Sequence, residues 1–314
     1  MQETVRKIII DTDPGQDDAL AMLLAFASDR LEVLGVTAVA GNVPLALTSV
    51  NARKVCELAG RTDMRVFAGA SEPIDRPLVT AENVHGKTGL DGPDLPEPTM
   101  PLQPGHAVDF IIETLLAHPP GEITLCTLGP LTNIAMALQR APEIADRIGQ
   151  IVMMGGGFFE GGNITPAAEF NIYVDPMAAA AVFASRAPIT MMPLDVTHQC
   201  LTTRSRLQAI HRLGTPVAKA AVELLEFFER YDEAKYGTDG GPLHDPTVIA
   251  WLLKPELFSG RQCNVEIETS SPLTEGMTVV DWWQVTDRRH NALVIRDVDA
   301  DGFYALLTEH LARL

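Results

Sequence analysis

The sequence predicts an α/β fold built on an open, mostly parallel sheet with helices on both faces. Short apolar runs rich in Val and Ile alternate with longer segments of helical pattern. The runs are apolar almost throughout, which is typical of strands buried on both faces of a sheet. Polar, acidic and glycine-rich segments follow these runs, at the strand ends where ligands bind in such sheets.

The elements follow one another in strand–helix order. Expected strands occupy residues 7–10, 32–39, 122–128, 148–154 and 188–194. Expected helices between them occupy residues 17–28, 47–60, 107–118, 130–141 and 175–185. From about residue 204 the alternation weakens into helices at 219–237 and 244–258, then strands in NVEIETSS, GMTVVDWW and NALVIRDV, and a closing helix in DADGFYALLTEHLARL.

No linker, repeat or low-complexity tract interrupts the chain, so we expect one domain over residues 1–314. The stretch 70–105 contains several prolines and little periodicity. A segment of this length without regular structure is more typical of a functional loop or lid than of a linker.

Composition limits the possible partners. The 314 residues are 46% hydrophobic and 21% charged, enough for a large core and unlike a disordered chain. Basic residues number 24 against 41 acidic ones, and the net charge of −17 argues against a nucleic-acid partner. A small substrate that is neutral or paired with a metal fits better.

The cysteines and the N-terminus indicate the compartment. Cys56, Cys126, Cys200 and Cys263 form no CxxC pair and have no His at zinc-ligand spacing. The N-terminus lacks a signal-peptide pattern, and no window approaches 18 uninterrupted apolar residues. We therefore expect a soluble cytoplasmic protein in a reducing compartment, with no membrane partner.

An acidic cluster, DTDPGQDDA at residues 11–19, directly follows the first expected strand. Crowded carboxylates either repel one another or share a cation, and oxygen-rich sites suit calcium or magnesium. The cluster therefore predicts a divalent-cation site formed by some of Asp11, Asp13, Asp17 and Asp18.

An EF-hand, a phosphatase site or a plain helix start accounts for the acidic cluster less well. An EF-hand loop needs Gly at position 6 and Glu at position 12, where this chain has Gln16 and Met22. A phosphoaspartate-type phosphatase has no need of the Pro-Gly break or of the acidic pair that opens a helix. Favourable charge at a helix N-terminus explains Asp17 and Asp18 only.

Two distant segments contain further candidate groups. In PLHDP, at residues 242–246, a His-Asp pair precedes a helix, a pattern that is also typical of an ordinary N-cap. In AEFNIYVDP, at residues 168–176, Glu169 and Asn171 are two apart; in an extended segment they would point the same way and can hold a diol.

Ordered motifs along the whole chain resemble one known family. They are DTDPGQDDA, AGN (40–42), NVHGKTGLDGP (83–93), GPLTNIA (129–135), MGGG (154–157), AEFNIYVDP, LDVTH (194–198) and LHDP (243–246). This series resembles the inosine–uridine preferring nucleoside hydrolases, and most of all the bacterial pyrimidine-leaning ribonucleoside hydrolases. The resemblance implies a Rossmann-like α/β sheet, a tightly bound calcium ion at the strand ends and a homodimer or homotetramer.

The resemblance also implies roles for individual residues. The calcium ligands would be the carboxylates of Asp13, Asp18 and Asp245 and the main-chain carbonyl of Leu128, where relatives can have Thr. A water and two ribose hydroxyls would complete the coordination. The residues that match ribose-binding positions are Asp17, Asn42, Asn163, Glu169 and Asn171, with Met154 packed beneath the sugar, and Asp11 matches an acid that supports the metal site.

The implied reaction is hydrolysis of the N-glycosidic bond of ribonucleosides to free base and ribose. Calcium is a weak Lewis acid, so its bound water needs a nearby general base, for which Asp13 is the candidate. His244 matches a histidine close to the base and His85 a second one on the lid side; either can assist departure of the base or simply contact it. For His85, packing within its loop against Asp91 or another neighbour is an equal alternative.

The expected cover of the base is the helix FFERYDEAKYG at residues 227–237, with Tyr231, Asp232 and Tyr236 as candidates. Pyrimidine-preferring relatives have an amide or imidazole in place of Asp232, and an ionised carboxylate accepts hydrogen bonds but does not donate them. We expect hydrolysis of uridine and cytidine, with inosine as a further substrate.

A phosphorylase and a binding protein are the alternative functions. A nucleoside phosphorylase cuts the same bond but needs a basic anion site, and Lys87 is the only Lys or Arg in the family-matching motifs. A calcium-dependent nucleoside-binding protein of the periplasm would show a secretion signal and a two-lobed layout, and neither is visible.

Overall fold

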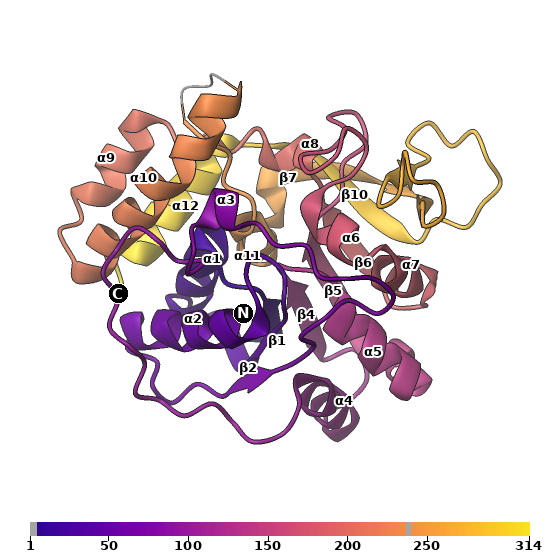
Figure 1. Ribbon diagram of the computed structural model, residues 1–314, viewed down its shortest axis with the longest axis horizontal. Coiled ribbons are helices and arrows are strands. Elements are labelled where there is room, and N and C mark those ends of the chain that lie inside the picture. The colour runs from indigo at the N-terminus through magenta and orange to yellow at the C-terminus, as the bar shows by residue number, and fades with distance from the viewer. Residues whose placement is uncertain (1–4, 237–239) are drawn as a thin grey trace.

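The computed structural model describes residues 5–236 and 240–314, without the side chains of residues 231–236, and its centre is an eight-stranded sheet (Figure 1). The strand order is β3-β2-β1-β4-β5-β6-β10-β7, and every neighbouring pair except β10–β7 is parallel. The strands are β1 (Arg6–Thr12), β2 (Leu31–Ala38), β3 (Val66–Ala68), β4 (Ile123–Thr127), β5 (Ile148–Met154), β6 (Ile189–Met192), β7 (Phe258–Cys263) and β10 (Ala292–Val298). The predicted mostly parallel sheet is therefore confirmed.

Helices cover both faces of this sheet (Figure 1). On one face, a hydrophobic cluster joins the sheet to α1 (Gln16–Phe26), α2 (Leu45–Leu58), α10 (Pro216–Tyr236), α11 (Pro246–Leu253) and α12 (Ala300–Leu311). On the other face, a second cluster joins it to α4 (Ala107–Ala117), α5 (Thr132–Arg140) and α7 (Pro176–Ala184). Ile8 and Ile10 of β1 contribute to the first cluster and Ile9 to the second, which explains why three consecutive isoleucines are buried.

Smaller elements complete the described part of the chain. They are α3 (Glu82–His85), α6 (Phe170–Val174), α8 (Leu194–Thr197), α9 (Arg204–His211), two 3₁₀ turns (Pro142–Asp146 and Pro255–Leu257) and the two-stranded sheet of β8 (Val265–Ile267) and β9 (Thr278–Val280). Over this same part of the chain, no helix is both long and apolar enough to span a lipid bilayer.

Several elements differ from the sequence prediction. β3 has only three residues and α9 has a mostly exposed sequence, so neither has a clear hydrophobic period. The helix expected over 244–258 ends at Leu253, because Pro255 follows, and Phe258 then begins β7. The stretch 70–105 contains α3, which places His85 beside the sheet edge described below.

Candidate active site

A cavity of about 100 Å³ opens at the carboxyl edge of the parallel strands. Its lining includes Asp17 and Asp18 after β1, Asn42 after β2, Leu128 after β4 and Met154 at the end of β5. The strand ends thus gather the polar segments that the sequence places after each apolar run.

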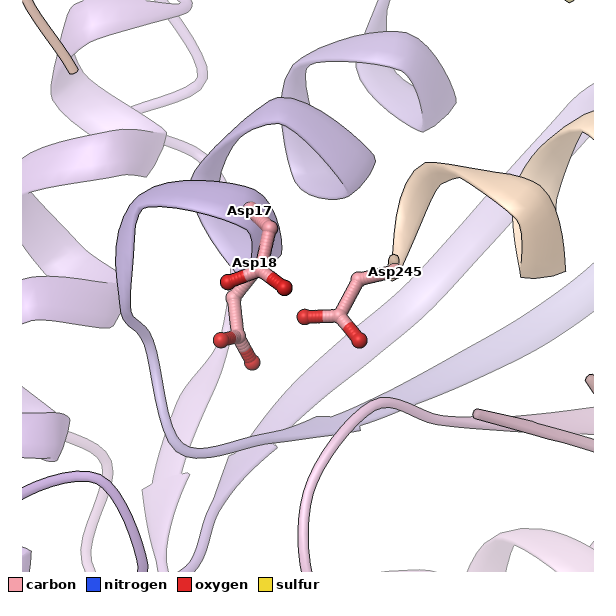
Figure 2. A group of neighbouring side chains, drawn as sticks. All are labelled: Asp17, Asp18 and Asp245. Carbon is pink, nitrogen blue, oxygen red and sulfur yellow. The ribbon is translucent and has the colours of Figure 1, made fainter. Parts of the chain in front are cut away.

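Three buried carboxylates meet in this cavity (Figure 2). Asp17 and Asp18 lie in the first turn of α1 and Asp245 lies directly before α11; each offers an oxygen within 4.8 Å of the others. Burial, together with the neighbouring acidic side chains, raises the pKa of Asp245 well above its usual range, and burial raises the pKa of Asp18. Among the cavity-lining residues that the structure describes there is no Lys or Arg, so a bound cation is the fitting partner for this charge.

The turn between β1 and α1 positions Asp18. The Thr12 hydroxyl and the Asp13 N–H donate to Asp18 Oδ1, and the Gly15 N–H donates to Oδ2 at 2.9 Å. Asp18 is therefore the acid of a capping interaction at the start of α1, and the Pro14-Gly15 break lets the chain fold back over it.

Asp245 is not an ordinary helix cap. It occupies the N-cap position of α11, but its side chain makes no capping hydrogen bond and faces Asp17 and Asp18 (Figure 2). Pro246 begins the helix, where a missing N–H costs nothing. The cap alternative for PLHDP is thus not what the structure shows.

Asp13 is fully buried, and it is neither among the described residues that line the cavity nor in the group formed by Asp17, Asp18 and Asp245. Its Oδ2 accepts the Asn42 N–H at 2.7 Å, whereas its Oδ1 is buried with no hydrogen-bond partner among the described residues. Burial and the carboxylates of Asp18 and Asp17 raise the pKa of Asp13 well above its usual range. A buried, unsatisfied carboxylate oxygen beside other acids is the condition under which a divalent cation stabilises the fold.

Asp11 and Asn133 form a buried support beneath this group. Asp11 Oδ1 accepts hydrogen bonds from the Thr37 hydroxyl and from Asn133 Nδ2 at 2.8 Å. Burial raises the pKa of Asp11 to about 7. The Asn133 side chain also donates to Ala38 O and accepts the Ala70 N–H, so it joins three segments of the chain. The motif GPLTNIA contains Asn133, but its local pattern does not predict these hydrogen bonds.

Glu169 and Asn171 line the cavity, but the expected extended segment is wrong because Phe170–Val174 is helix α6. Glu169 is its N-cap and accepts the N–H groups of Gly156 at 2.8 Å and Asn171 at 2.9 Å. The Asn171 side chain donates to Leu128 O at 2.7 Å and to Met154 O at 3.3 Å. Asn163, also in the lining, accepts the Phe170 N–H.

Both predicted histidines line the cavity. His244 Nδ1 lies 2.7 Å from the Thr197 hydroxyl, and burial, with the nearby His198 and His85, lowers the pKa of His244 to about 3. His85 Nδ1 lies 2.7 Å from Gln16 Oε1, and burial lowers the pKa of His85 to about 3 as well.

The alternative interpretation of His85 is packing against Asp91 or another neighbour, and the structure shows other neighbours, Gln16 and Phe228, in place of Asp91. The Asp91 carboxylate instead accepts the backbone N–H groups of Lys87 and Thr88. The ring neighbour of His85 is Phe228, 5.5 Å away between centroids.

The cavity lining also contains residues to which the sequence assigns no role: Ala81, Asn83, Val84, Ile164, Phe170, His198, Phe228 and Pro242. His198 lies in the motif LDVTH and Phe228 in the helix expected to cover the base, so the sequence indicates their segments but not their contacts. Tyr231, Asp232 and Tyr236 lie in α10 outside the side chains that the structure describes, and their predicted contacts stay predictions.

Comparison with known proteins gives consistent matches over the chain. The family model described as inosine-uridine preferring nucleoside hydrolase matches residues 8–305. A pyrimidine-specific ribonucleoside hydrolase RihA from Photobacterium profundum is 51% identical, over 98% of this chain and 99% of its own. An uncharacterized protein from Schizosaccharomyces pombe is 56% identical over the same shares of the two chains. Among solved structures, a purine-preferring ribonucleoside hydrolase from Gardnerella vaginalis superposes with a TM-score of 0.92 at 32% identity, over 98% of each chain.

Proposed function

The chain belongs to the inosine–uridine preferring nucleoside hydrolase family and is a ribonucleoside N-glycosidase, and on this premise we propose that it hydrolyses uridine and cytidine, with inosine as a further substrate. The observation that supports the proposal most directly is the meeting of Asp17, Asp18 and Asp245 in the cavity at the strand ends. The pyrimidine preference rests on likeness to relatives named as pyrimidine-specific.

The donor set fits calcium. Carboxylates of Asp13, Asp18 and Asp245 and the carbonyl of Leu128 supply only oxygen, which hard cations prefer. The unsatisfied Asp13 Oδ1 and the raised pKa values of the three acids are what a tightly held cation would relieve. When bound, such a cation orients substrate hydroxyls and lowers the pKa of a water molecule.

The chain's own side chains then perform the remaining steps. Asp17, Glu169 and Asn171 would hold the 2′- and 3′-hydroxyls of the ribose, a bound cation would strengthen this contact, and Met154 would pack beneath the ring. Asn42 and Asn163 complete the polar wall around the sugar. The carboxylates of Asp17 and Glu169 and the amide oxygens of the asparagines stabilise the positive charge that develops at C1′ and the ring oxygen as the bond to the base breaks.

Proton transfer involves two residues. Asp13 accepts a proton from the attacking water, a role that a carboxylate of raised pKa can perform near neutral pH. His244, whose ring centroid lies 6.2 Å from that of Phe228 in the cavity lining, assists departure of the base. Tyr231, Asp232 and Tyr236 are proposed base contacts from the sequence alone.

A reducing-sugar assay tests the proposal. Purified protein is incubated with uridine, cytidine, inosine, adenosine or guanosine, in buffer free of phosphate, with calcium or with excess chelator. We expect ribose release that the chelator abolishes and calcium restores, with uridine or cytidine fastest. Release of free base that requires added phosphate and yields no reducing sugar would identify a phosphorylase, and faster cleavage of adenosine or guanosine would refute the base preference.

Three further properties belong to the same proposal. We propose a single domain over residues 1–314. We also propose a homodimer or homotetramer, and analytical ultracentrifugation can measure this oligomeric state. The four cysteines are free and buried, which supports a place in the reducing cytoplasm.

A further inference from the structure

Gln16, in the motif DTDPGQDDA, is fully buried and makes three hydrogen bonds with the loop that contains His85. Its side-chain nitrogen donates to His85 O at 3.0 Å and to Asp91 O at 3.0 Å. A carbonyl oxygen can only accept, so the end of the Gln16 amide that faces these two groups must be the NH₂. The opposite end, Oε1, therefore faces the His85 ring.

This orientation determines the protonation of His85. Gln16 Oε1 lies 2.7 Å from His85 Nδ1 and can only accept, so Nδ1 must be protonated. A neutral imidazole has one N–H, and burial favours the neutral ring. In a neutral ring with Nδ1–H, the second nitrogen, Nε2, has no proton and can only accept a hydrogen bond.

The position of the His85 ring leaves its Nε2 free to accept a hydrogen bond from a ligand. Nδ1 and Cε1 lie over the backbone of Gly15, so closely that a Cβ there would be 2.3 Å from Nδ1. The ring lines the cavity beside Phe228. Among the described residues, Nδ1 is the ring nitrogen of His85 that has a protein partner.

His244 differs from His85 in this respect. Its Nδ1 faces the Thr197 hydroxyl at 2.7 Å, which can rotate to donate or to accept. His244 can thus present a protonated Nε2, whereas His85 cannot while Gln16 is in place.

We propose that Gln16 is a positioning residue that locks His85 in the Nδ1–H tautomer, so that His85 Nε2 recognises the nucleoside by accepting a hydrogen bond from an N–H or O–H of the substrate. The choice of nucleoside as ligand rests on the proposed function, and the tautomer does not. His85 then acts in recognition, and the donation of a hydrogen bond to the leaving base falls to His244. Because the proposed function assigns the 2′- and 3′-hydroxyls to Asp17, Glu169 and Asn171, the donor is either a base N–H or the ribose 5′-hydroxyl.

The tautomer is tested on the protein without substrate. Long-range proton–nitrogen correlation spectra of ¹⁵N-histidine-labelled protein separate protonated from unprotonated ring nitrogens, and His85→Gln identifies the His85 signals. We expect an unprotonated Nε2 and a protonated Nδ1 in the wild type. A protonated Nε2 in the wild type would overturn the proposal.

Three variants test the part played by Gln16. Gln16→Leu removes the acceptor and should shift His85 toward the Nε2–H tautomer, while Gln16→Glu keeps an acceptor at the same place and should retain Nδ1–H. Asn51→Ala is the matched control, because Asn51 donates to Thr88 O in the same loop and to Pro14 O in the turn before Gln16, without contacting His85 in any described hydrogen bond. An unchanged tautomer in Gln16→Leu, or the same shift in Asn51→Ala, would refute the role of Gln16.

Kinetics distinguish the two possible donors. 3-Methyluridine lacks the N–H of the base, and 5′-deoxyuridine lacks the 5′-hydroxyl of the ribose. For one of them we expect the wild type to lose roughly 3- to 10-fold in kcat/KM relative to uridine, and His85→Ala to show no such discrimination. Equal rates for all three substrates in the wild type would refute recognition by His85. Absence of sugar release from every nucleoside would refute the proposed function instead, and would leave the tautomer result intact.

Discussion

Replacement of Asn133 with Ala should destabilise the protein strongly, because this buried amide joins three segments beneath the cavity. Its nitrogen donates to Asp11 Oδ1 at 2.8 Å and to Ala38 O at 3.2 Å, and its oxygen accepts the Ala70 N–H at 2.8 Å. Asn133 is 0% exposed, so water cannot replace these bonds without entering the fold.

The loss of stability can be estimated from what happens to each group that Asn133 binds. The Ala70 N–H would lose its acceptor and stay buried, at a cost of about 1–3 kcal/mol. Asp11 would lose a donor to a carboxyl group, worth about 1.5–3 kcal/mol when ionised. Ala38 O keeps the Gly69 N–H at 2.9 Å and adds little. We therefore expect the free energy of unfolding to fall by about 3–5 kcal/mol.

Urea unfolding, with and without calcium, measures this loss. Asn264→Ala is the matched control: Asn264 is also buried, and its amide donates to Glu266 Oε1 at 3.0 Å and to Arg289 O at 2.9 Å, outside the cavity lining. We expect the control to leave kcat unchanged and Asn133→Ala to lower it. A loss in Asn133→Ala of less than about 1 kcal/mol, the size of one ordinary hydrogen bond, would refute the reasoning.

Three further outcomes are expected. Asp13→Asn should lower kcat by about 10²- to 10⁴-fold with little change in KM, and near-normal turnover in steady-state kinetics would remove Asp13 from the role of base. Gly129→Ala should also lower kcat, because the new Cβ would lie 2.1 Å from Asp13 Oδ1; wild-type rates would mean that the carboxylate moves aside freely. Since the pKa of buried His85 falls to about 3 in the folded state, the unfolded chain takes up its proton first as the pH drops below about 6.5. This contribution to stability is present above that pH and is lost toward pH 3, by roughly 2 kcal/mol at pH 5 in urea titrations. His85→Gln should lack this pH-dependent contribution. A difference in the free energy of unfolding between the wild type and His85→Gln that does not vary with pH would contradict the lowered pKa of His85.

The sheet was predictable because its central strands are buried on both faces. β1 and β4–β6 are therefore nearly continuous apolar runs, whereas the sequence of β7, FSGRQC, is exposed at four central positions and has no such run. Glu169 and Asn171 were expected to point the same way because residues two apart do so in a strand, but Glu169 is the N-cap of a helix. Local pattern cannot show that a helix begins there, since α6 has only five residues.

The same limit applies to the site. The acids and histidines stand in recognisable motifs, so their gathering at the strand ends could be expected. The bond between Gln16 and His85 and the bonds of Asn133 join residues that are distant in sequence. Such contacts follow from tertiary packing and have no local sequence signal.

The separation of Asp245 from Asp17 and Asp18 along the chain bears on biosynthesis. The two acids of α1 leave the ribosome early, while Asp245 is added only after α10. Until α11 packs against α1, a nascent chain has the mutual repulsion of the acids without a complete set of ligands. A cation that needs all three acids would bind the finished fold more tightly than any partial one, and its free concentration would then affect how much of the newly made chain stays in the native state.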